Sequence, residues 1–173
     1  YCGKNQCLVI TAQKLMSVVI NIAKTYYQPI QTYSKLFASG ASEKENLAYL
    51  VGGCVISFVA QWPAQSRQAF TNQQPVDELM GAILLSNLFL LPLIFYLISA
   101  VFFLFTKIFR SNILGSELRL IIFWAYLAAT PILLLVGLVE GFLGKNYQYF
   151  IVAGLWLATF LSFIYSGFRG RSL

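Results

Sequence analysis

Few residues in this sequence combine reactive chemistry with a position beside an apolar environment. Glu117 and Arg119 precede a long apolar run, Glu140 follows it, and Asn87 lies within an earlier run. A polar or charged group next to hydrocarbon is costly to keep there, so it is a candidate for handling protons, ions or substrate. A helix of about twenty residues would hold Glu117 and Glu140 roughly 30 Å apart, so these charges cannot form one site. We take Asn87, Glu117, Arg119 and Glu140 as candidate functional polar residues.

The sequence contains no residue set that is typical of catalysis or of metal binding. It has no histidine, which excludes His-dependent nucleophilic catalysis and His-ligated metal sites. The pair Gly52-Gly53 lies in an apolar run and lacks the lysine of a phosphate-binding loop. Cys2 and Cys7 have no second pair that would complete a zinc pattern. We therefore expect a protein that is not an enzyme, with no catalytic residue, cofactor or metal.

The composition is that of a membrane protein. Apolar residues make up 58% of the chain and charged residues 10%, against about 25% charged residues in a soluble domain. A soluble fold of this size could not bury so much apolar surface, and disorder requires low hydrophobicity. The long uncharged runs are continuous rather than alternating, which excludes barrel strands, and a spanning helix needs about 20 such residues. The sequence predicts an all-α polytopic membrane helical bundle with four transmembrane helices, at about residues 47–63, 79–105, 118–139 and 147–167.

The segment before these runs is predicted to be an amphipathic interfacial helix. Between residues 17 and 40, apolar side chains fall on one face of a helix, while lysines and glutamines fall on the other. This pattern suits a helix that lies in the membrane interface, and packing against other protein is the alternative. Pro29 should bend or break the helix. Ser42 followed by Glu45 forms a capping box, which predicts that the first span starts there.

The chain divides by composition into three parts. It begins at Tyr1, and its first methionine is Met16. The apolar patch before Met16 is too short for a signal peptide, so we interpret residues 1–15 as an upstream or non-native segment. Residues 16–46 are the predicted cytoplasmic amphipathic helix and link, and residues 47–173 are the four-span membrane domain.

The basic residues indicate how the chain is oriented. With four spans, ten of the twelve lysines and arginines fall on one side, and Arg67 and Lys145 fall on the other. Short loops rich in Lys and Arg stay in the cytoplasm, so we expect both termini to be cytoplasmic. The net charge of +6 then reflects topology, and we expect no nucleic-acid partner. The residues expected to contact anionic lipid headgroups are Lys24, Lys35, Lys107 and Arg110.

Small and aromatic residues predict how the spans pack. Small residues that recur four positions apart let helix backbones approach closely in a bilayer, within the bundle or in a dimer. The candidate packing residues are Ala125, Ala129, Gly137, Gly141, Gly154 and Ala158. Aromatic residues near span ends are typical of an interfacial belt. The candidate belt residues are Trp62, Trp124, Tyr126, Tyr147, Tyr149 and Tyr165.

Two prolines, Pro92 and Pro131, lie near the centres of predicted spans. Each removes a backbone hydrogen bond and should kink its helix. Ser86, Asn87 and Thr130 are close enough along the chain to bond the carbonyls that the prolines free. Broken helices build substrate sites in transporters, whereas a static kink in a packed bundle is the plainer interpretation.

Two segments of the chain resemble the short bacterial members of the YIP1 family. One is residues 57–63, with the sequence SFVAQWP, followed by Arg67. The other is residues 123–131, with the sequence FWAYLAATP, continuing to GLVEG at residues 137–141. The resemblance covers the chain from about Met16 to its last residue. It implies a multi-span helical protein of the bacterial cytoplasmic membrane without known catalytic residues.

The resemblance transfers no functional residue. Eukaryotic members of the family are linked to vesicle trafficking and small-GTPase partners, but their acidic aspartate-leucine-tyrosine-glycine-proline signature does not occur here. We expect a non-enzymatic role in membrane organisation, or an adaptor role. The expected partners are the lipid bilayer and other membrane proteins or a second copy of the chain. The alternative is a small transporter or a transporter membrane subunit built around Asn87, Pro92 and Pro131.

Overall fold

Helices are the only regular secondary structure in the described part of the chain. The computed structural model describes residues 4–40, 42–73, 75–108 and 113–171, with side chains from residue 16 onward, and no strand occurs among them. This result confirms the all-α prediction. The elements are α1 (Lys4–Tyr27), α2 (Pro29–Ala38), α3 (Glu43–Asn72), α4 (Val76–Leu85), the π-helix η1 (Ser86–Leu90), α5 (Leu91–Ile108), α6 (Gly115–Leu143) and α7 (Tyr147–Arg171).

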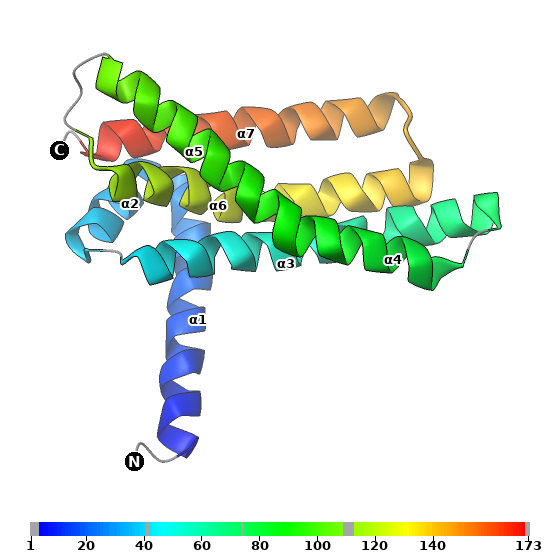
Figure 1. Ribbon diagram of the computed structural model, residues 1–173, viewed down its shortest axis with the longest axis horizontal. Helices are drawn as coiled ribbons and strands as arrows, with labels where there is room; N and C mark the ends of the chain where they lie inside the picture. The colour runs from blue at the N-terminus through cyan, green and yellow to red at the C-terminus, as the bar shows by residue number, and fades with distance from the viewer. Residues whose placement is uncertain (1–3, 41, 74, 109–112, 172–173) are drawn as a thin grey trace.

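Four helices are long and apolar enough to cross a membrane. They are α3, the continuous α4–η1–α5 helix (Val76–Ile108), α6 and α7. They correspond to the four predicted spans and run along the long axis of the molecule, with α5 crossing the others obliquely (Figure 1). We call the end of the bundle where α7 finishes the C-terminal end, and the end at the α6–α7 connection the opposite end.

The start of α3 follows the predicted capping box. Ser42 is the N-cap residue, and its N–H donates to Glu45 Oε2 at 3.4 Å. The helix does not end at Pro63, the predicted limit of this span, but continues through it to Asn72. The helical turns after the proline still pack against the rest of the bundle, since Ala64 and Ala69 are buried. Packing of one face therefore maintains the helix beyond the proline.

The N-terminal segment breaks where Pro29 predicts. Gln28 separates α1 from α2, and Pro29 takes the first position of α2, where its missing N–H has no intrahelical partner to lose. Helix α1 runs across the long axis of the bundle, and α2 folds back along the end of α7 (Figure 1). In α2 the Tyr33 hydroxyl donates to the Ile121 carbonyl at 3.3 Å. Burial raises the pKa of Tyr33 well above its usual range.

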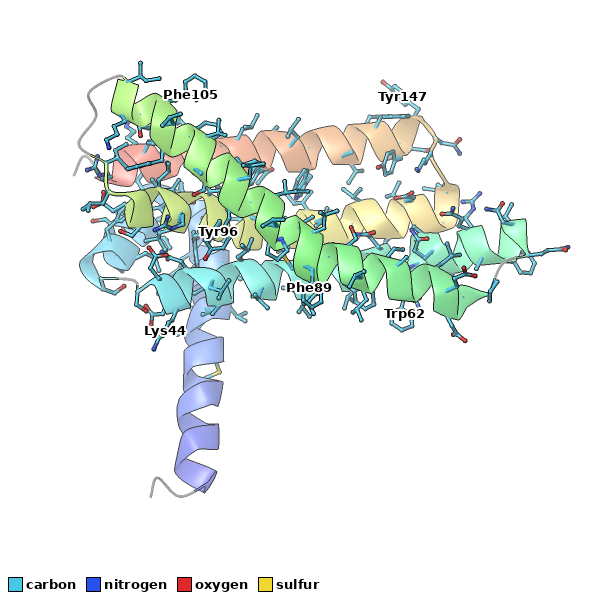
Figure 2. The ribbon with its side chains drawn as sticks, in the orientation of Figure 1. Lys44, Trp62, Phe89, Tyr96, Phe105 and Tyr147 are labelled. Atoms are coloured by element: carbon cyan, nitrogen blue, oxygen red, sulfur yellow. The ribbon has the colours of Figure 1, made fainter. Side chains whose placement is uncertain are left out.

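Helix α6 forms the centre of the bundle. Every residue from 120 to 130 is buried, and α6 contacts α3, α5 and α7. The belt prediction is therefore wrong for Trp124 and Tyr126, which are 0% and 3% exposed. The exposed fractions of Trp62 and Tyr147, labelled in Figure 2, are 52% and 78%, as an interfacial belt requires. Tyr165 is also exposed, and Tyr149 is half-buried.

Close approach of backbones joins α3 to α6. A Cβ atom on Gly137 would lie 1.7 Å from the carbonyl oxygen of Ala60, and one on Gly141 would lie 2.5 Å from Cβ of Pro63. Two of the candidate packing residues thus lie where α3 touches α6. Ala125 and Ala129 are fully buried on the same helix.

The two small residues of α7 are placed differently. Gly154 and Ala158 are exposed, and a Cβ on Gly154 would meet nothing within 4 Å. They lie on the outer face of α7, so they do not form a packing surface within this bundle.

The two span prolines are accommodated in different ways. Pro131 cannot bond the carbonyl of Leu127, and Thr130 Oγ1 donates to that oxygen at 2.7 Å, as its position predicts. Near Pro92 the helix widens instead into η1, in which the Leu91 N–H bonds the Ser86 carbonyl. A π-turn of this kind redistributes the carbonyls before a proline and often marks a functional site.

Candidate functional site

Two ion pairs join helices at the C-terminal end of the bundle. Glu117 bonds Arg171 at 2.8 Å, and its side chain also accepts from the Leu114 N–H at 3.1 Å. Arg119 forms a bidentate ion pair with Glu43, with Nε 3.1 Å from Oε2. These ion pairs join α6 to α7 and α3 to α6, so Glu117 and Arg119 stabilise contacts between helices.

Glu140 lies at the opposite end, apart from the other two candidates. Its carboxylate is 3.7 Å from the ammonium of Lys145, and the side chains are 26% and 72% exposed. Arg67 of α3 lies nearby and donates to the carbonyl of Gly141 at 3.5 Å. The opposite end therefore presents one carboxylate and two cations near the α6–α7 connection.

Asn87 is the centre of a buried polar cluster within the spans. It is 4% exposed and lies in η1. Its Oδ1 accepts from Ser57 Oγ at 2.9 Å and from Gln61 Nε2 at 3.3 Å, and its Nδ2 donates to the Ile83 carbonyl at 3.1 Å. Asn87 therefore links the second span to α3. The prediction that it bonds the carbonyl freed by Pro92 is wrong, because its Nδ2 donates to the Ile83 carbonyl instead.

A cavity of about 360 Å³ connects this cluster to the charges at the opposite end. It lies between α3, α6 and the start of α7, and polar side chains line most of its length. Its lining residues are Ser57, Ala60, Gln61, Gln65, Leu133, Val136, Gly137, Glu140, Lys145 and Tyr149. The cavity thus has neutral hydrogen-bonding groups inside and a pair of opposite charges near the α6–α7 connection.

The polar wall on α3 is the part of the site that the sequence prediction missed. Ser57, Gln61 and Gln65 recur at intervals of four residues, so they share one face of a helix. That spacing is a detectable signal, because polar residues on one stripe of a spanning helix face protein or water rather than lipid. Of the predicted candidates, Glu140 lines the cavity, and Asn87 contacts two lining residues.

The predicted headgroup residues lie on the surface where the structure describes them. Lys24 and Lys35 are exposed on the N-terminal helices, and Lys107 is exposed at the end of α5, 5.9 Å from the centre of the Phe103 ring. Arg110 lies outside the described residues. These positions place cations at the same end of the bundle as the C-terminus.

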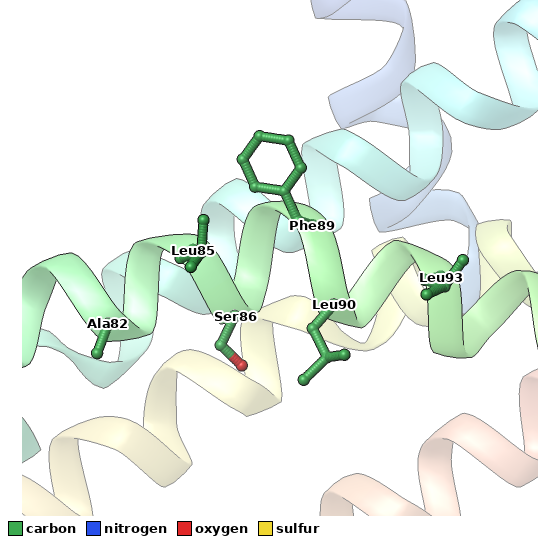
Figure 3. Close-up of a pocket in the computed structure, with 6 residues that line it drawn as sticks. All are labelled: Ala82, Leu85, Ser86, Phe89, Leu90 and Leu93. Atoms are coloured by element: carbon green, nitrogen blue, oxygen red, sulfur yellow. The ribbon is translucent and has the colours of Figure 1, made fainter.

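A second concave surface, on the second span, is apolar. It has a volume of about 460 Å³, and its lining residues are Ala82, Leu85, Ser86, Phe89, Leu90 and Leu93 (Figure 3). The Ser86 hydroxyl is the one polar side chain among them. A shallow apolar surface on the outside of a spanning helix is what lipid chains cover, so we assign no chemistry to it. Among the described residues, no group of three or more Cys, Asp or Glu side chains could hold a metal.

The fold and the site define a class of protein: an integral membrane protein built as an all-α bundle with four apolar spans and a polar cavity within it. Comparison with known proteins gives no closer identification, since no family model, no curated protein and no solved structure matches the chain.

Proposed function

We propose that this chain is a non-enzymatic integral membrane protein of the short bacterial YIP1 type that organises the membrane or serves as an adaptor for other membrane proteins. We place it in the bacterial cytoplasmic membrane with both termini in the cytoplasm. The family assignment is supported by the segments at residues 57–63 and 123–131. The orientation is supported by the basic residues, most of which belong to the C-terminal end of the bundle under the four-span topology.

The surface of α1 is the observation that supports a role in membrane organisation. One face of this helix packs on the bundle through Val18 and Ile22. A second, apolar face is left uncovered by the protein, with Val19 65%, Ile20 46% and Tyr27 87% exposed. Because α1 lies across the bundle axis (Figure 1), this face would insert into one leaflet beside the spans. A wedge in one leaflet expands that leaflet and bends the membrane.

Vesicle shape tests this proposal. We expect the full chain, reconstituted into vesicles that contain anionic lipid, to produce tubules or smaller vesicles than the lipid alone. Replacing the uncovered face by Val19→Gln and Ile20→Gln should abolish the effect, because the helix loses its insertion energy. Vesicle diameters measured by electron cryomicroscopy provide the comparison.

The matched control places the same residue type on the polar face of α1. Ser17→Gln and Asn21→Gln should leave the vesicle deformation unchanged. Equal vesicle diameters with and without the wild-type protein would contradict the proposal. Equal vesicle diameters for the double variant of the uncovered face and the double variant of the polar face would also contradict it.

Cysteine labelling tests the orientation. In a chain with Cys2, Cys7 and Cys54 replaced by alanine, Gln73→Cys is expected to react with a membrane-impermeant maleimide in intact cells. Lys44→Cys should react only after the membrane is made permeable, because it lies at the C-terminal end. The extent of labelling measured by gel shift gives the result, and labelling of Lys44→Cys in intact cells would reverse the topology.

The polar cavity favours a small transporter, or a transporter membrane subunit, as the second candidate. Ser57 and Gln61 line it and bond Asn87 beside the π-turn, although Pro131 lies on an exposed surface. Transport by alternating access would expose the cavity to each side in turn. In the same labelling assay, Gln61→Cys would then react from both sides, whereas a static cavity allows reaction from one side.

A further inference from the structure

The mouth of the cavity presents charges of both signs. Glu140 and Lys145 both line it, and their charged atoms are 3.7 Å apart, which is longer than a tight ion pair. The Arg67 guanidinium lies beside them, bonded to the Gly141 carbonyl. A ligand that carries an anionic and a cationic group would replace this loose pair by two charge-assisted contacts. A purely anionic ligand would leave its charge facing Glu140.

The mouth lies at the depth where lipid headgroups are found. Large exposed aromatic side chains surround this end of the bundle, and Tyr147 begins α7 at the α6–α7 connection (Figure 2). Such aromatic residues mark the boundary between hydrocarbon and headgroups. The exposed fractions are 52% for Trp62, 80% for Phe142, 78% for Tyr147 and 65% for Phe150.

The interior of the cavity is suited to the neutral part of the same ligand. Gln61, Gln65 and Tyr149 line it with hydrogen-bonding groups, while Leu133 and Val136 add an apolar wall. Phosphate and ester oxygens accept hydrogen bonds, and the first methylenes of an acyl chain suit an apolar wall.

We propose that the cavity between α3, α6 and α7 binds a lipid headgroup that joins a phosphate to a primary ammonium, as phosphatidylethanolamine does. The ammonium bonds Glu140, and the phosphate lies against Lys145, with Arg67 beside it. The acyl chains leave along the apolar outer surface. This site is at the opposite end of the bundle from α1, so the proposal goes beyond the proposed membrane organisation and does not rest on it.

Lipid retention by the purified protein tests the proposal. The full chain is reconstituted with equal amounts of phosphatidylethanolamine and phosphatidylglycerol, extracted gently, and its bound lipids are counted by mass spectrometry. We expect phosphatidylethanolamine to be enriched. Glu140→Gln should reduce its retention about tenfold, in line with the loss of one charge-assisted hydrogen bond. Phosphatidylglycerol retention should rise in this variant, because its phosphate no longer faces a carboxylate. Lys145→Gln should reduce the retention of both lipids, because each carries a phosphate.

Matched variants outside the cavity provide the controls. Glu78→Gln removes an exposed carboxylate from α4, and Lys44→Gln removes an exposed ammonium from α3; neither should alter retention. If Glu140→Gln fails to fold, Gln65→Leu removes a lining amide without touching the charges and should also lower phosphatidylethanolamine retention.

Three outcomes would overturn the proposal. The first is equal retention of the two lipids by the wild-type chain, and the second is full retention of phosphatidylethanolamine by Glu140→Gln. The third is competition by free O-phosphoethanolamine at the affinity of the lipid, which would assign the site to a soluble zwitterion. None of these results affects the vesicle-shape test, because the α1 variants leave the cavity intact.

Discussion

Adding one methyl group at Gly137 is expected to destabilise the bundle by about 3 kcal/mol or more. A Cβ at this position would lie 1.7 Å from the carbonyl oxygen of Ala60 and 2.6 Å from its carbonyl carbon. These are backbone atoms of a helix, so no side-chain rotation relieves the contact. The Gly137→Ala change must push α3 away from α6, and it therefore also changes the shape of the cavity that both helices line. The free energy of unfolding in mixed micelles, followed by near-UV circular dichroism, measures the effect.

Gly154→Ala is the matched control for this prediction. Its Cβ would meet nothing within 4 Å, and alanine has a higher helix propensity than glycine by about 1 kcal/mol. We expect this variant to be neutral or slightly stabilised. If Gly137→Ala were as stable as Gly154→Ala, the close approach of α3 and α6 would be incorrect, and the shape of the cavity would need revision.

The features that the sequence predicts correctly are those set by local chemistry. The uncharged runs locate the four spans, because each run must contain enough apolar residues to cross hydrocarbon. Pro29 ends α1, and Ser42 with Glu45 starts α3, because each acts on hydrogen bonds within its own helical turn. Thr130 satisfies the carbonyl freed by Pro131 for the same reason.

The features that it does not predict depend on contacts between distant segments. From local chemistry alone, Pro63 predicts the end of a helix. Helix α3 continues because the turns after Pro63 pack on other helices. Arg119 bonds Glu43, which is 76 residues away, and no local pattern gives that pairing. Helix α6 is apolar on all sides, so periodicity could not show that Trp124 is buried and faces protein rather than lipid.

The cavity was only partly predictable. Asn87 and Glu140 stand out as polar groups in or beside apolar runs, and both belong to the site or touch it. The spacing of Ser57, Gln61 and Gln65 is also visible in the sequence. What brings the lining residues together is the close approach of α3 and α6 at Gly137 and the position of the start of α7 beside them. This is tertiary geometry that one sequence does not specify.

Trp124→Ala is expected to cost about 3–5 kcal/mol and to release α1 from the bundle. The indole is fully buried. Its Nε1 donates to Thr25 Oγ1 of α1 at 3.2 Å, and its ring packs edge-on against Tyr49 of α3, with centroids 5.0 Å apart. One side chain of α6 therefore contacts both α1 and the first span. Removing it leaves a cavity at their junction and takes away the N–H that the Thr25 hydroxyl accepts, while that hydroxyl still donates to the Asn21 carbonyl at 2.7 Å.

Two readouts separate the local effect from general destabilisation. The distance distribution between spin labels at Ser17 and Gln73, measured by pulsed electron paramagnetic resonance, should broaden in Trp124→Ala as α1 detaches. Trp62→Ala, which removes an exposed indole, should leave the distribution unchanged. Thr25→Val keeps the packing but leaves the buried indole N–H without its acceptor, so it should cost about 1–3 kcal/mol with α1 still docked. An unbroadened distribution in Trp124→Ala would show that α1 is held by other contacts. Vesicle bending could then persist in that variant, since the uncovered face of α1 would still lie beside the spans.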